Sequence, residues 1–417
     1  MGKTIAEKIL SRKSGRDVKA NDLVIADLDF ALGQDGTSPL AIRAFNDMQG
    51  QKTFAPDKIA MVIDHSSPSP LQGVSELHQQ MRDFAETQQI NLYDIGVGVC
   101  HQLIPEQGHV VPGDLVIGAD SHTCTYGAVN VFSTGVGSTD LAAAMISGQL
   151  WFKVPETIKF ELNGKLPPGV FSKDVSLYLI GDMTADGATY RAVEYTGPII
   201  SDLSVEARFT ISNMAIEMGA KCGLMAADEK TAAWIKEHSE RDFTPIFSDQ
   251  DAVYADVKTY DLSNLAPQIA KPHTVDNVSP VADLVGLPIQ QGVIGTCTNG
   301  RLEDLRIAAV ILKDRKIARG TRLIVAPSSR QVFLDAIKEG LIETLVNAGA
   351  VLVTPGCGPC VGTHNGIPSD GENVISTANR NFKGRMGNNR AFIYLASPAT
   401  VAVSVLYGKI SDPREFF

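Results

Sequence analysis

The sequence predicts an α/β protein built from parallel-sheet units. Along the chain, a short apolar run repeatedly ends at Gly, Ser, Asp or Cys, and a segment with helical periodicity follows. Short buried strands that alternate with helices are typical of parallel sheets, because a parallel crossover usually contains a helix. The chain has 417 residues, and one hydrophobic core stops growing near roughly 250 to 300 residues. We therefore expect more than one domain.

The strands and helices are expected in alternation. Residues 157–163 alternate apolar and polar side chains, which is the period of a half-buried strand, whereas the other strands are short continuous apolar runs. No repeat of fixed period is present, which excludes a solenoid. The expected strands are 58–63, 96–100, 114–118, 157–163, 293–295, 322–325 and 350–353, and the expected helices are 70–86, 140–152, 302–313 and 331–338.

Two breaks divide the chain into three expected α/β domains. Pro155 stands between a predicted helix and the strand 157–163. Residues 266–280 contain three prolines and several polar residues between two stretches that look folded. These breaks predict domains at 1–154, 155–270 and 271–417.

Composition narrows the function classes. The chain is 44% hydrophobic and 20% charged, and no apolar run approaches the roughly 18 residues that a membrane span needs. Its net charge of −10 disfavours binding to nucleic acid or anionic lipid. The N-terminus lacks a secretory apolar core, and six cysteines are too few for a secreted disulfide scaffold. We expect a cytoplasmic protein with a small-molecule partner.

Three cysteines follow predicted strands. Cys357 and Cys360 form a C-x-x-C directly after strand 350–353, and Cys297 follows strand 293–295. Carboxyl ends of parallel strands share one edge, so the three thiols can converge there. A redox dithiol would use only two of them. Three thiolates leave one coordination position open, which fits an iron-sulfur cluster or a zinc ion with a bound water.

Histidines and aspartates occupy similar places. Asp64 and His65 follow strand 58–63, His101 follows 96–100, and Asp120 and His122 follow 114–118. Acid–base groups are commonly delivered to such an edge. The remaining histidines lack this context, and we expect surface or structural roles for His78, His109, His238, His273 and His364.

A basic segment completes the candidate site. Arg380 and Arg385 lie in the segment 379–385, which also contains Asn379, Lys383 and a glycine. Such a segment can be a solvated loop. It can also bind carboxylates, because guanidinium groups hold planar anions in bidentate fashion.

Four of these motifs, in this order, resemble the aconitase superfamily: Asp120-Ser121-His122-Thr123, Gly295-Thr296-Cys297-Thr298-Asn299, Cys357-Gly358-Pro359-Cys360 and Asn379-Arg380-Asn381-Phe382-x-Gly-Arg385. The resemblance covers essentially the whole chain. It implies three aconitase-type α/β domains and a hydro-lyase that dehydrates a small hydroxy-dicarboxylic or tricarboxylic acid. In that family a [4Fe-4S] cluster on three cysteines uses its fourth iron as a Lewis acid.

The resemblance also implies roles for individual residues. One cluster per chain is expected on Cys297, Cys357 and Cys360, with Asn299 and Asn379 contacting it. The implied catalytic groups are Asp64, His65, His101, Asp120, His122 and Glu194, and the implied substrate contacts are Gln34, Asp35, Ser121, Arg380 and Arg385.

The resemblance further implies a partner chain. Single-chain members carry a fourth, swivelling domain with the catalytic serine base, which this sequence does not match. We expect a small subunit to supply it, in a heterodimer or heterotetramer. Ser328-Ser329-Arg330 imitates the motif, but it precedes helix 331–338, where a serine is expected to cap the helix. Some relatives bind RNA as regulators, and the acidic balance argues against that class here.

Overall fold

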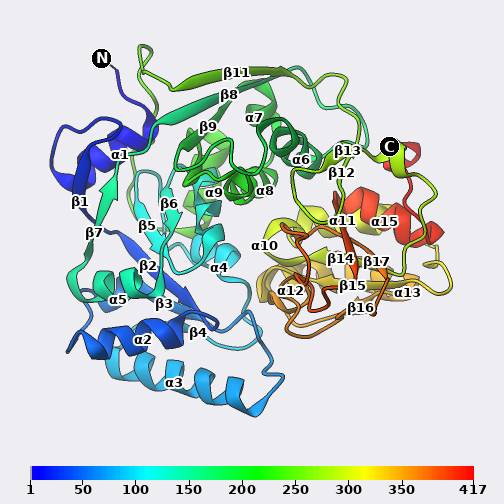
Figure 1. Ribbon diagram of the computed structural model, residues 1–417, viewed down its shortest axis with the longest axis horizontal. Coiled ribbons are helices and arrows are strands. Elements are labelled where there is room, and N and C mark those ends of the chain that lie inside the picture. Colours follow the sequence, from blue (N-terminus) through cyan, green and yellow to red (C-terminus); the bar gives the residue numbers. More distant parts are fainter. Residues whose placement is uncertain (1) are drawn as a thin grey trace.

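The computed structural model describes residues 2–417 and confirms the α/β class. Three sheets, mostly parallel, are accompanied by one two-stranded ribbon, and the units they form surround a common centre (Figure 1). No helix among the described residues is long and apolar enough to cross a membrane.

The first sheet has five parallel strands in the order β4-β3-β2-β5-β6. Successive residues of β2 face opposite sides: Ala31 packs in one core with α2, α3 and α5, and Leu32 packs in another core with α4 and η2. The elements are β2 (Phe30–Gln34), α2 (Ser38–Asp47), β3 (Ile59–Val62), α3 (Gln72–Gln88), β4 (Asn91–Tyr93), α4 (Cys100–Glu106), β5 (Leu115–Gly118), η2 (Ser121–Val129), β6 (Phe132–Gly135) and α5 (Ser138–Ser147).

Two predicted elements of this region are wrong. The helix expected over 140–152 ends at Ser147, because Gly148 takes a left-handed conformation with φ of 73°. The chain then forms β7 (Gln149–Lys153), which pairs antiparallel with β1 (Leu23–Asp27), after the N-terminal helix α1 (Ile5–Ser14). The strand expected over 96–100 is absent, because Gly96 and Gly98 turn the chain with φ of 75° and 151°.

The second sheet has four parallel strands in the order β10-β9-β8-β11. Strand β8 matches the alternating segment 157–163 that the sequence predicts. The elements are β8 (Thr157–Asn163), α6 (Ser172–Met183), β9 (Ala192–Thr196), α7 (Pro198–Asp202), α8 (Val205–Asn213), η3 (Met214–Met218), β10 (Cys222–Met225), α9 (Glu229–His238) and β11 (Asp256–Asp261).

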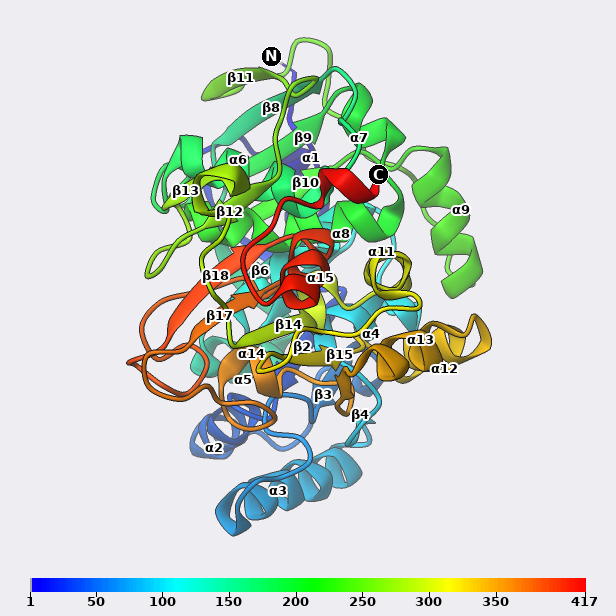
Figure 2. The same ribbon diagram turned by 90° about the vertical axis from the view of Figure 1, so that its right-hand side faces the viewer.

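The third sheet has seven strands in the order β13-β12-β18-β17-β14-β15-β16, in which β12 runs antiparallel to both of its neighbours, β13 and β18, and the other pairs are parallel. Figure 2 labels the strands of this order from β13 to β15. The sheet begins at β12, a few residues before the expected break at residue 271, and the division into domains stays a prediction. Its strands are β12 (Gln268–Ala270), β13 (Val278–Pro280), β14 (Gln291–Gly295), β15 (Arg322–Ala326), β16 (Val351–Leu352), β17 (Asn373–Ser376) and β18 (Phe392–Ala396). Its helices are η4 (Val281–Leu284), α10 (Thr296–Asn299), α11 (Leu302–Leu312), α12 (Arg330–Lys338), α13 (Leu341–Ala348), α14 (Gly358–Val361), α15 (Pro398–Tyr407) and η5 (Pro413–Phe416).

The first and third sheets each reverse their direction of winding. From β2 the chain adds β3 and β4 on one side and β5 and β6 on the other, so the reversal lies between β2 and β5. From β14 it adds β15 and β16 on one side and β17 and β18 on the other. Open α/β sheets bind ligands outside the carboxyl ends of strands at such reversals. Helices α4 and α10 contact each other between the two sheets (Figure 1).

Candidate active site

A single cavity collects the residues that follow the two reversals. It is lined from the first unit by His65, Val99, His101, Asp120, Ser121 and His122, and from the third unit by Cys297, Cys357, Asn379, Arg380 and Arg385. The structure therefore brings together most of the side chains that the sequence selected.

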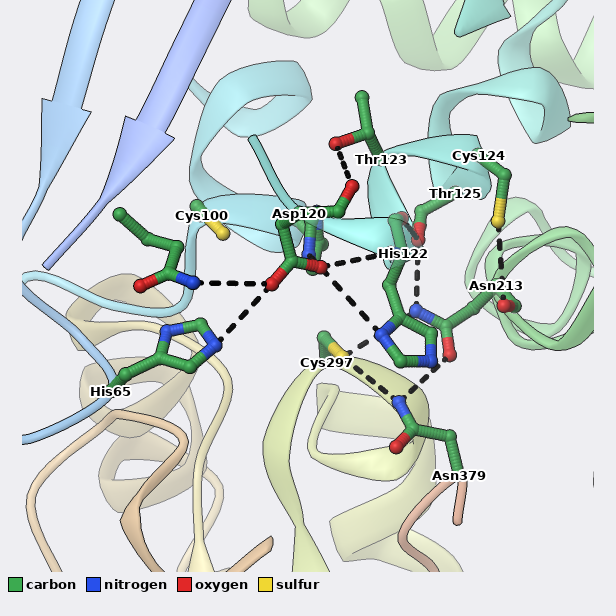
Figure 3. Close-up of polar contacts among 12 residues, drawn as sticks. His65, Cys100, Asp120, His122, Thr123, Cys124, Thr125, Asn213, Cys297 and Asn379 are labelled. Atoms are coloured by element: carbon green, nitrogen blue, oxygen red, sulfur yellow. Dashed lines mark hydrogen bonds and ion pairs between the residues drawn. The ribbon is translucent and has the colours of Figure 1, made fainter. Parts of the chain in front are cut away.

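Asp120 is the centre of the histidine side of this cavity (Figure 3). It follows β5, and its Oδ1 lies 2.8 Å from His101 Nε2 and accepts the His122 backbone N–H at 2.8 Å. Its Oδ2 lies 3.4 Å from both His65 Nε2 and Gln34 Nε2. Burial opposes ionisation, but the charge and hydrogen bond of His101, with hydrogen bonds from His122 and His65, hold the Asp120 pKa well below its ordinary value. Asp120 is therefore a carboxylate that orients three imidazoles.

His65 is held between two carboxylates. Its Nδ1 lies 2.7 Å from Asp64 Oδ1, and its other ring nitrogen faces Asp120. Burial lowers the pKa of His65, but the charge of Asp64 and the hydrogen bond to Asp120 raise it well above the ordinary value. The opposite oxygen of Asp64 accepts the Cys100 N–H at 2.8 Å, which ties this loop to the start of α4.

Asp35 does not face the cavity as the resemblance implied. Its carboxylate accepts the backbone N–H groups of Asp64, His65 and Ser66 at 3.0, 2.7 and 2.8 Å, and His78 Nε2 lies 3.2 Å away. Although burial opposes it, the His78 hydrogen bond and the charge of His65 hold the pKa of Asp35 far below its ordinary value. Asp35 therefore shapes the loop that carries His65. Gln34 does not line the cavity, and its connection to the cavity is the contact of its amide with Asp120.

Glu194 lies elsewhere, so its implied catalytic role is wrong. It is the third residue of β9, and its carboxylate accepts hydrogen bonds from Ser248 Oγ at 2.7 Å and Tyr254 OH at 2.9 Å. A mid-strand side chain points across the sheet and not out of its carboxyl edge. Burial raises the pKa of Glu194, as expected for a carboxyl group inside the second unit.

Glu217, at the end of α8–η3, takes the place expected for Glu194. Its Oε1 lies 2.8 Å from His122 Nε2, and both carboxylate oxygens accept from Arg380 Nε at 2.9 and 3.0 Å. Burial opposes ionisation, but His122 and Arg380 hold the pKa of Glu217 below its ordinary value. The second unit thus contributes a carboxylate that the sequence reading missed.

Amides and a guanidinium surround the thiols. Cys297 follows β14, and its sulfur accepts from Asn213 Nδ2 at 3.4 Å and Asn379 Nδ2 at 3.7 Å (Figure 3). The Cys360 sulfur lies 3.6 Å from Asn379 Oδ1 and 3.3 Å from Arg385 Nη2. A hydrogen bond from Cys357 and the charge of Arg385 hold the pKa of the Cys360 thiol well below its ordinary value, although burial opposes this.

Asn299 does not reach the thiols, which corrects a second implied contact. Its Nδ2 donates to Asp304 Oδ1 at 2.8 Å and to Thr210 Oγ1 at 3.3 Å. Asn299 closes the short helix α10, so its side chain turns toward the start of α11. Asn213 supplies the second amide contact to Cys297 in its place.

Asn213 and Glu217 carry a signal that sequence reasoning could use. They are four residues apart in a stretch that is otherwise mainly apolar, so they lie on one side of a helical segment. Both are buried, as polar side chains that face an internal site must be. A search for polar residues at the carboxyl ends of strands misses them, because their side chains project from the end of a helical segment.

Two buried cations and one half-buried cation lie around the thiols. Lys173 is fully buried, and its ammonium donates to the backbone oxygens of Thr377 and Ala378 at 3.0 and 2.7 Å. Arg301 is also buried behind Cys297, and Arg385 contacts Cys360. Buried cations are costly unless an anion compensates them. The thiol side therefore fits a bound group that carries negative charge.

The spacing of the three sulfurs fits a group larger than one ion. A zinc ion bound by thiolates at about 2.3 Å brings its sulfurs within about 4 Å of one another. Among the described residues, the sets of three ligand atoms that lie within 4.8 Å of one another are His101–Asp120–His122 and Asp35–Asp64–His65, and the three thiols are not such a set. The donors thus fit a thiolate-bound cluster better than zinc.

The other predicted features also have places in the structure. Ser329 caps α12 by accepting the Val332 N–H at 3.1 Å, as the sequence predicts, and it donates to Glu106 at 2.7 Å. His109 stacks on Phe30 with ring centroids 4.6 Å apart, which is a structural role. Ser121 lines both the cavity and a neighbouring groove of about 390 Å³ that includes Trp151 and Ile216.

The fold and this site define the class of protein. Residues 7–408 match the family model described as the aconitase family (aconitate hydratase), and the chain belongs to that family. The solved structure of holo-form aconitase X from Thermococcus kodakaraensis has a similar fold, with a TM-score of 0.50 and 12% identity over 90% of this chain and 88% of that one.

Curated relatives match over the full length of the chain. It is 48% identical to 3-isopropylmalate dehydratase large subunit 1 of Methanopyrus kandleri and 51% identical to large subunit 2 of Archaeoglobus fulgidus, with 100% of both chains covered in each comparison. It is 50% identical to the probable methanogen homoaconitase large subunit of Methanosarcina mazei, over 94% of this chain and 100% of that one.

Proposed function

We propose that this chain is the large subunit of a 3-isopropylmalate dehydratase. This iron-sulfur hydro-lyase of leucine biosynthesis isomerises 2-isopropylmalate and 3-isopropylmalate through isopropylmaleate, and we propose that it acts in the cytoplasm. The observation that carries the proposal is one cavity lined by Cys297, Cys357 and the Asp120–His101 pair, with the Cys360 sulfur held beside it by the lining residues Asn379 and Arg385. The full-length relatives named as dehydratase large subunits support it.

The cofactor that we propose is one [4Fe-4S] cluster per chain. Cys297, Cys357 and Cys360 would hold it, and buried Lys173 and Arg301, with half-buried Arg385, would compensate its charge. When bound, it supplies a Lewis-acidic iron for the substrate hydroxyl and carboxylate.

The histidines would handle the proton of the leaving hydroxyl. Loss of water needs a proton donor within hydrogen-bond reach of that oxygen. His101 lies in the cavity wall with Nε2 on the ionised Asp120. His65 lies between Asp64 and Asp120, which raise its pKa well above the ordinary value although burial opposes this. These two imidazoles are the donors that we propose.

The arginines would hold the substrate carboxylates. Glu217 fixes Arg380 through Nε alone among the described residues, which leaves the terminal nitrogens of Arg380 to face a ligand in the cavity. Arg385 also lines the cavity, beside Cys360. Two guanidinium groups suit a dicarboxylic acid. Ser121 completes the wall near Asp120, and Gln34 supports Asp120 from outside the cavity through its Nε2.

The base that removes the carbon-bound proton would come from a separate small subunit. Ser329 is committed to its cap and to Glu106, which argues against a role as base. The relatives are named as large subunits, which supports a partner that carries the swivelling domain. We propose a heterodimer or heterotetramer in which this partner docks over the strand ends bearing His122, Cys297 and Cys357.

Hydratase activity on isopropylmaleate tests this function. The cluster-loaded chain should be inactive alone and active after the small subunit of an isopropylmalate dehydratase is added. Equal rates with and without the added subunit would place the base within this chain. No activity with any dehydratase small subunit would refute the proposal.

Homoaconitase is the second candidate function, because a relative of that name is 50% identical to the chain. 2,3-Dimethylmalate dehydratase is a third. Reconstitution with small subunits of each type, assayed on the three unsaturated acids, separates them. The enzyme should be fastest with isopropylmaleate and the matching small subunit. An RNA-binding role is disfavoured by the net charge of −10, and the absence of RNA retention at low salt would exclude it.

A further inference from the structure

We infer that Arg301 is a positioning residue that fixes the separation of His101 and Cys297. The inference rests on the proposed function, because it assigns a proton donor to His101 and a cluster ligand to Cys297. It goes beyond that function because it names the contact that fixes the position of His101, in the first unit, relative to Cys297, in the third.

The contacts of Arg301 join the residues that follow the two functional side chains. Its Nε donates to Gln102 Oε1 at 3.0 Å, and its Nη1 donates to the Thr298 backbone oxygen at 2.9 Å. Gln102 follows His101 in α4, and Thr298 follows Cys297 in α10. One guanidinium group therefore spans the first and third units one residue away from each functional group.

The second unit also contacts the Arg301 guanidinium. The Arg301 guanidinium carbon lies 5.0 Å from the centroid of the Phe209 ring, and Phe209 belongs to α8. This helix ends at Asn213, whose amide contacts the Cys297 sulfur. Elements of all three units thus meet at Arg301.

The burial of Arg301 indicates that its role depends on the two acceptors that its planar guanidinium reaches. The side chain is 1% exposed, and no carboxylate within residues 2–417 forms a salt bridge with its guanidinium. Asp304 accepts the Arg301 backbone N–H, which caps α11. A buried cation without a paired carboxylate is costly. A planar fork that reaches two acceptors at once is a property that lysine lacks.

Gln102 has a second link to the third unit. Its Nε2 donates to Glu106 Oε2 at 3.0 Å, and the same oxygen accepts from Ser329 Oγ at 2.7 Å. The Val99 N–H also donates to Ser328 O at 2.8 Å. Helix α4 is therefore attached to the third unit at both ends. Without the Arg301 contact, its first turn, which carries His101, loses the attachment nearest to Cys297.

The test uses Gln102→Leu, which removes the acceptor of Arg301 together with the hydrogen bond from Gln102 to Glu106 and leaves the Cys297 loop unchanged. In the cluster-loaded complex with its small subunit, kcat should fall about 10- to 100-fold, since misplacement of about 1 Å can cost that much. The KM should stay within about twofold, and the iron content should not change. Arg301→Lys should have a similar effect, and the double variant should be no worse than the more severe single variant.

Arg306→Lys is the matched control. Arg301 is the N-cap of helix α11, and Arg306 lies in the same helix. Arg306, however, is exposed and pairs with Glu339. Its substitution should leave kcat unchanged. Wild-type kcat in Gln102→Leu, strictly additive effects in the double variant, or a fall in kcat that only follows lost iron would overturn the inference.

Amide hydrogen exchange gives a readout that needs no turnover. In Gln102→Leu, exchange should be faster both in residues 99–106 and in residues 296–299, because the contact joins the two segments. Faster exchange around residue 102 alone would also overturn the inference. If the wild-type complex shows no hydratase activity, the proposed function fails, and the exchange experiment still decides whether Arg301 couples the two helices.

Discussion

The histidine side and the thiol side of the cavity are built in different ways. On the histidine side, each charged group has a partner inside the chain: Asp120 pairs with His101 and His65, and Asp35 binds the loop amides. On the thiol side, the sulfurs contact amides and Arg385, and fully buried Lys173 has only backbone oxygens and a methionine sulfur as partners.

This difference separates a preformed part of the site from one that needs its ligand. Each carboxylate of the histidine network has a hydrogen-bond partner within the chain, so we expect the network to fold into its working geometry without a cofactor. The thiol side holds more buried positive charge than it can pair, and an anionic group would remove that cost. Substitutions on the two sides should therefore fail differently: one side should lose the cofactor, and the other should lose only the chemistry.

The largest effect is expected for Cys360→Ser on the thiol side. The cluster should be lost, and hydratase activity should fall by at least about a thousandfold, because the Lewis acid goes with it. Iron and sulfide analysis with visible absorption measures the first effect, and isopropylmaleate hydration measures the second. Cys222→Ser, a buried thiol in β10, is the control and should retain its cluster. Full cluster content in Cys360→Ser would show that Cys360 is not a cluster ligand.

An effect of about 10²- to 10⁴-fold on kcat is expected for Asp120→Asn on the histidine side. The substitution keeps the size of the side chain and removes the charge that orients His65, His101 and His122. Iron content should equal that of the wild type. Asp140→Asn, at the start of α5, is the control. Loss of the cluster in Asp120→Asn would show that the two sides are not independent.

The smallest effect is expected for Asp35→Asn and should depend on pH. The folded-state pKa of Asp35 is depressed below 3.8, so its carboxylate stabilises the fold above that pH. The variant should lose about 2 kcal/mol of unfolding free energy at pH 7. The difference from wild type should shrink as pH falls below about 4 toward the folded-state pKa. Urea unfolding at pH 7, 5 and 3 measures it, and a difference independent of pH would contradict the charge argument.

The sequence predicted the strand ends well because their pattern is local. Apolar runs followed by Asp, His or Cys correctly placed His65, Asp120 and Cys297 at the edges of two sheets. His101 reached the cavity although its predicted strand is absent, because two glycines turn the chain into α4 before it.

The remaining errors concern the direction of side chains. Asp35 follows strand β2, which was not among the strands predicted from the sequence, and it turns back to bind loop amides. Glu194 was selected through the family resemblance, but its carboxylate accepts hydrogen bonds from Ser248 and Tyr254. Glu217 leaves a helix end in another unit. Such orientations depend on contacts between residues far apart in sequence, which local patterns do not contain.

The position of the ligands along the chain sets an order for maturation. The first sheet is complete at Gly135, whereas the three thiols lie between Cys297 and Cys360. Domains generally fold from the N-terminus as the chain leaves the ribosome. The nascent chain therefore acquires its acid–base groups long before the last thiol is synthesised. If the chain binds the cluster that we propose, loading of iron and sulfide would be a late step, and until then the Asp120–histidine network would stand beside thiols without their ligand.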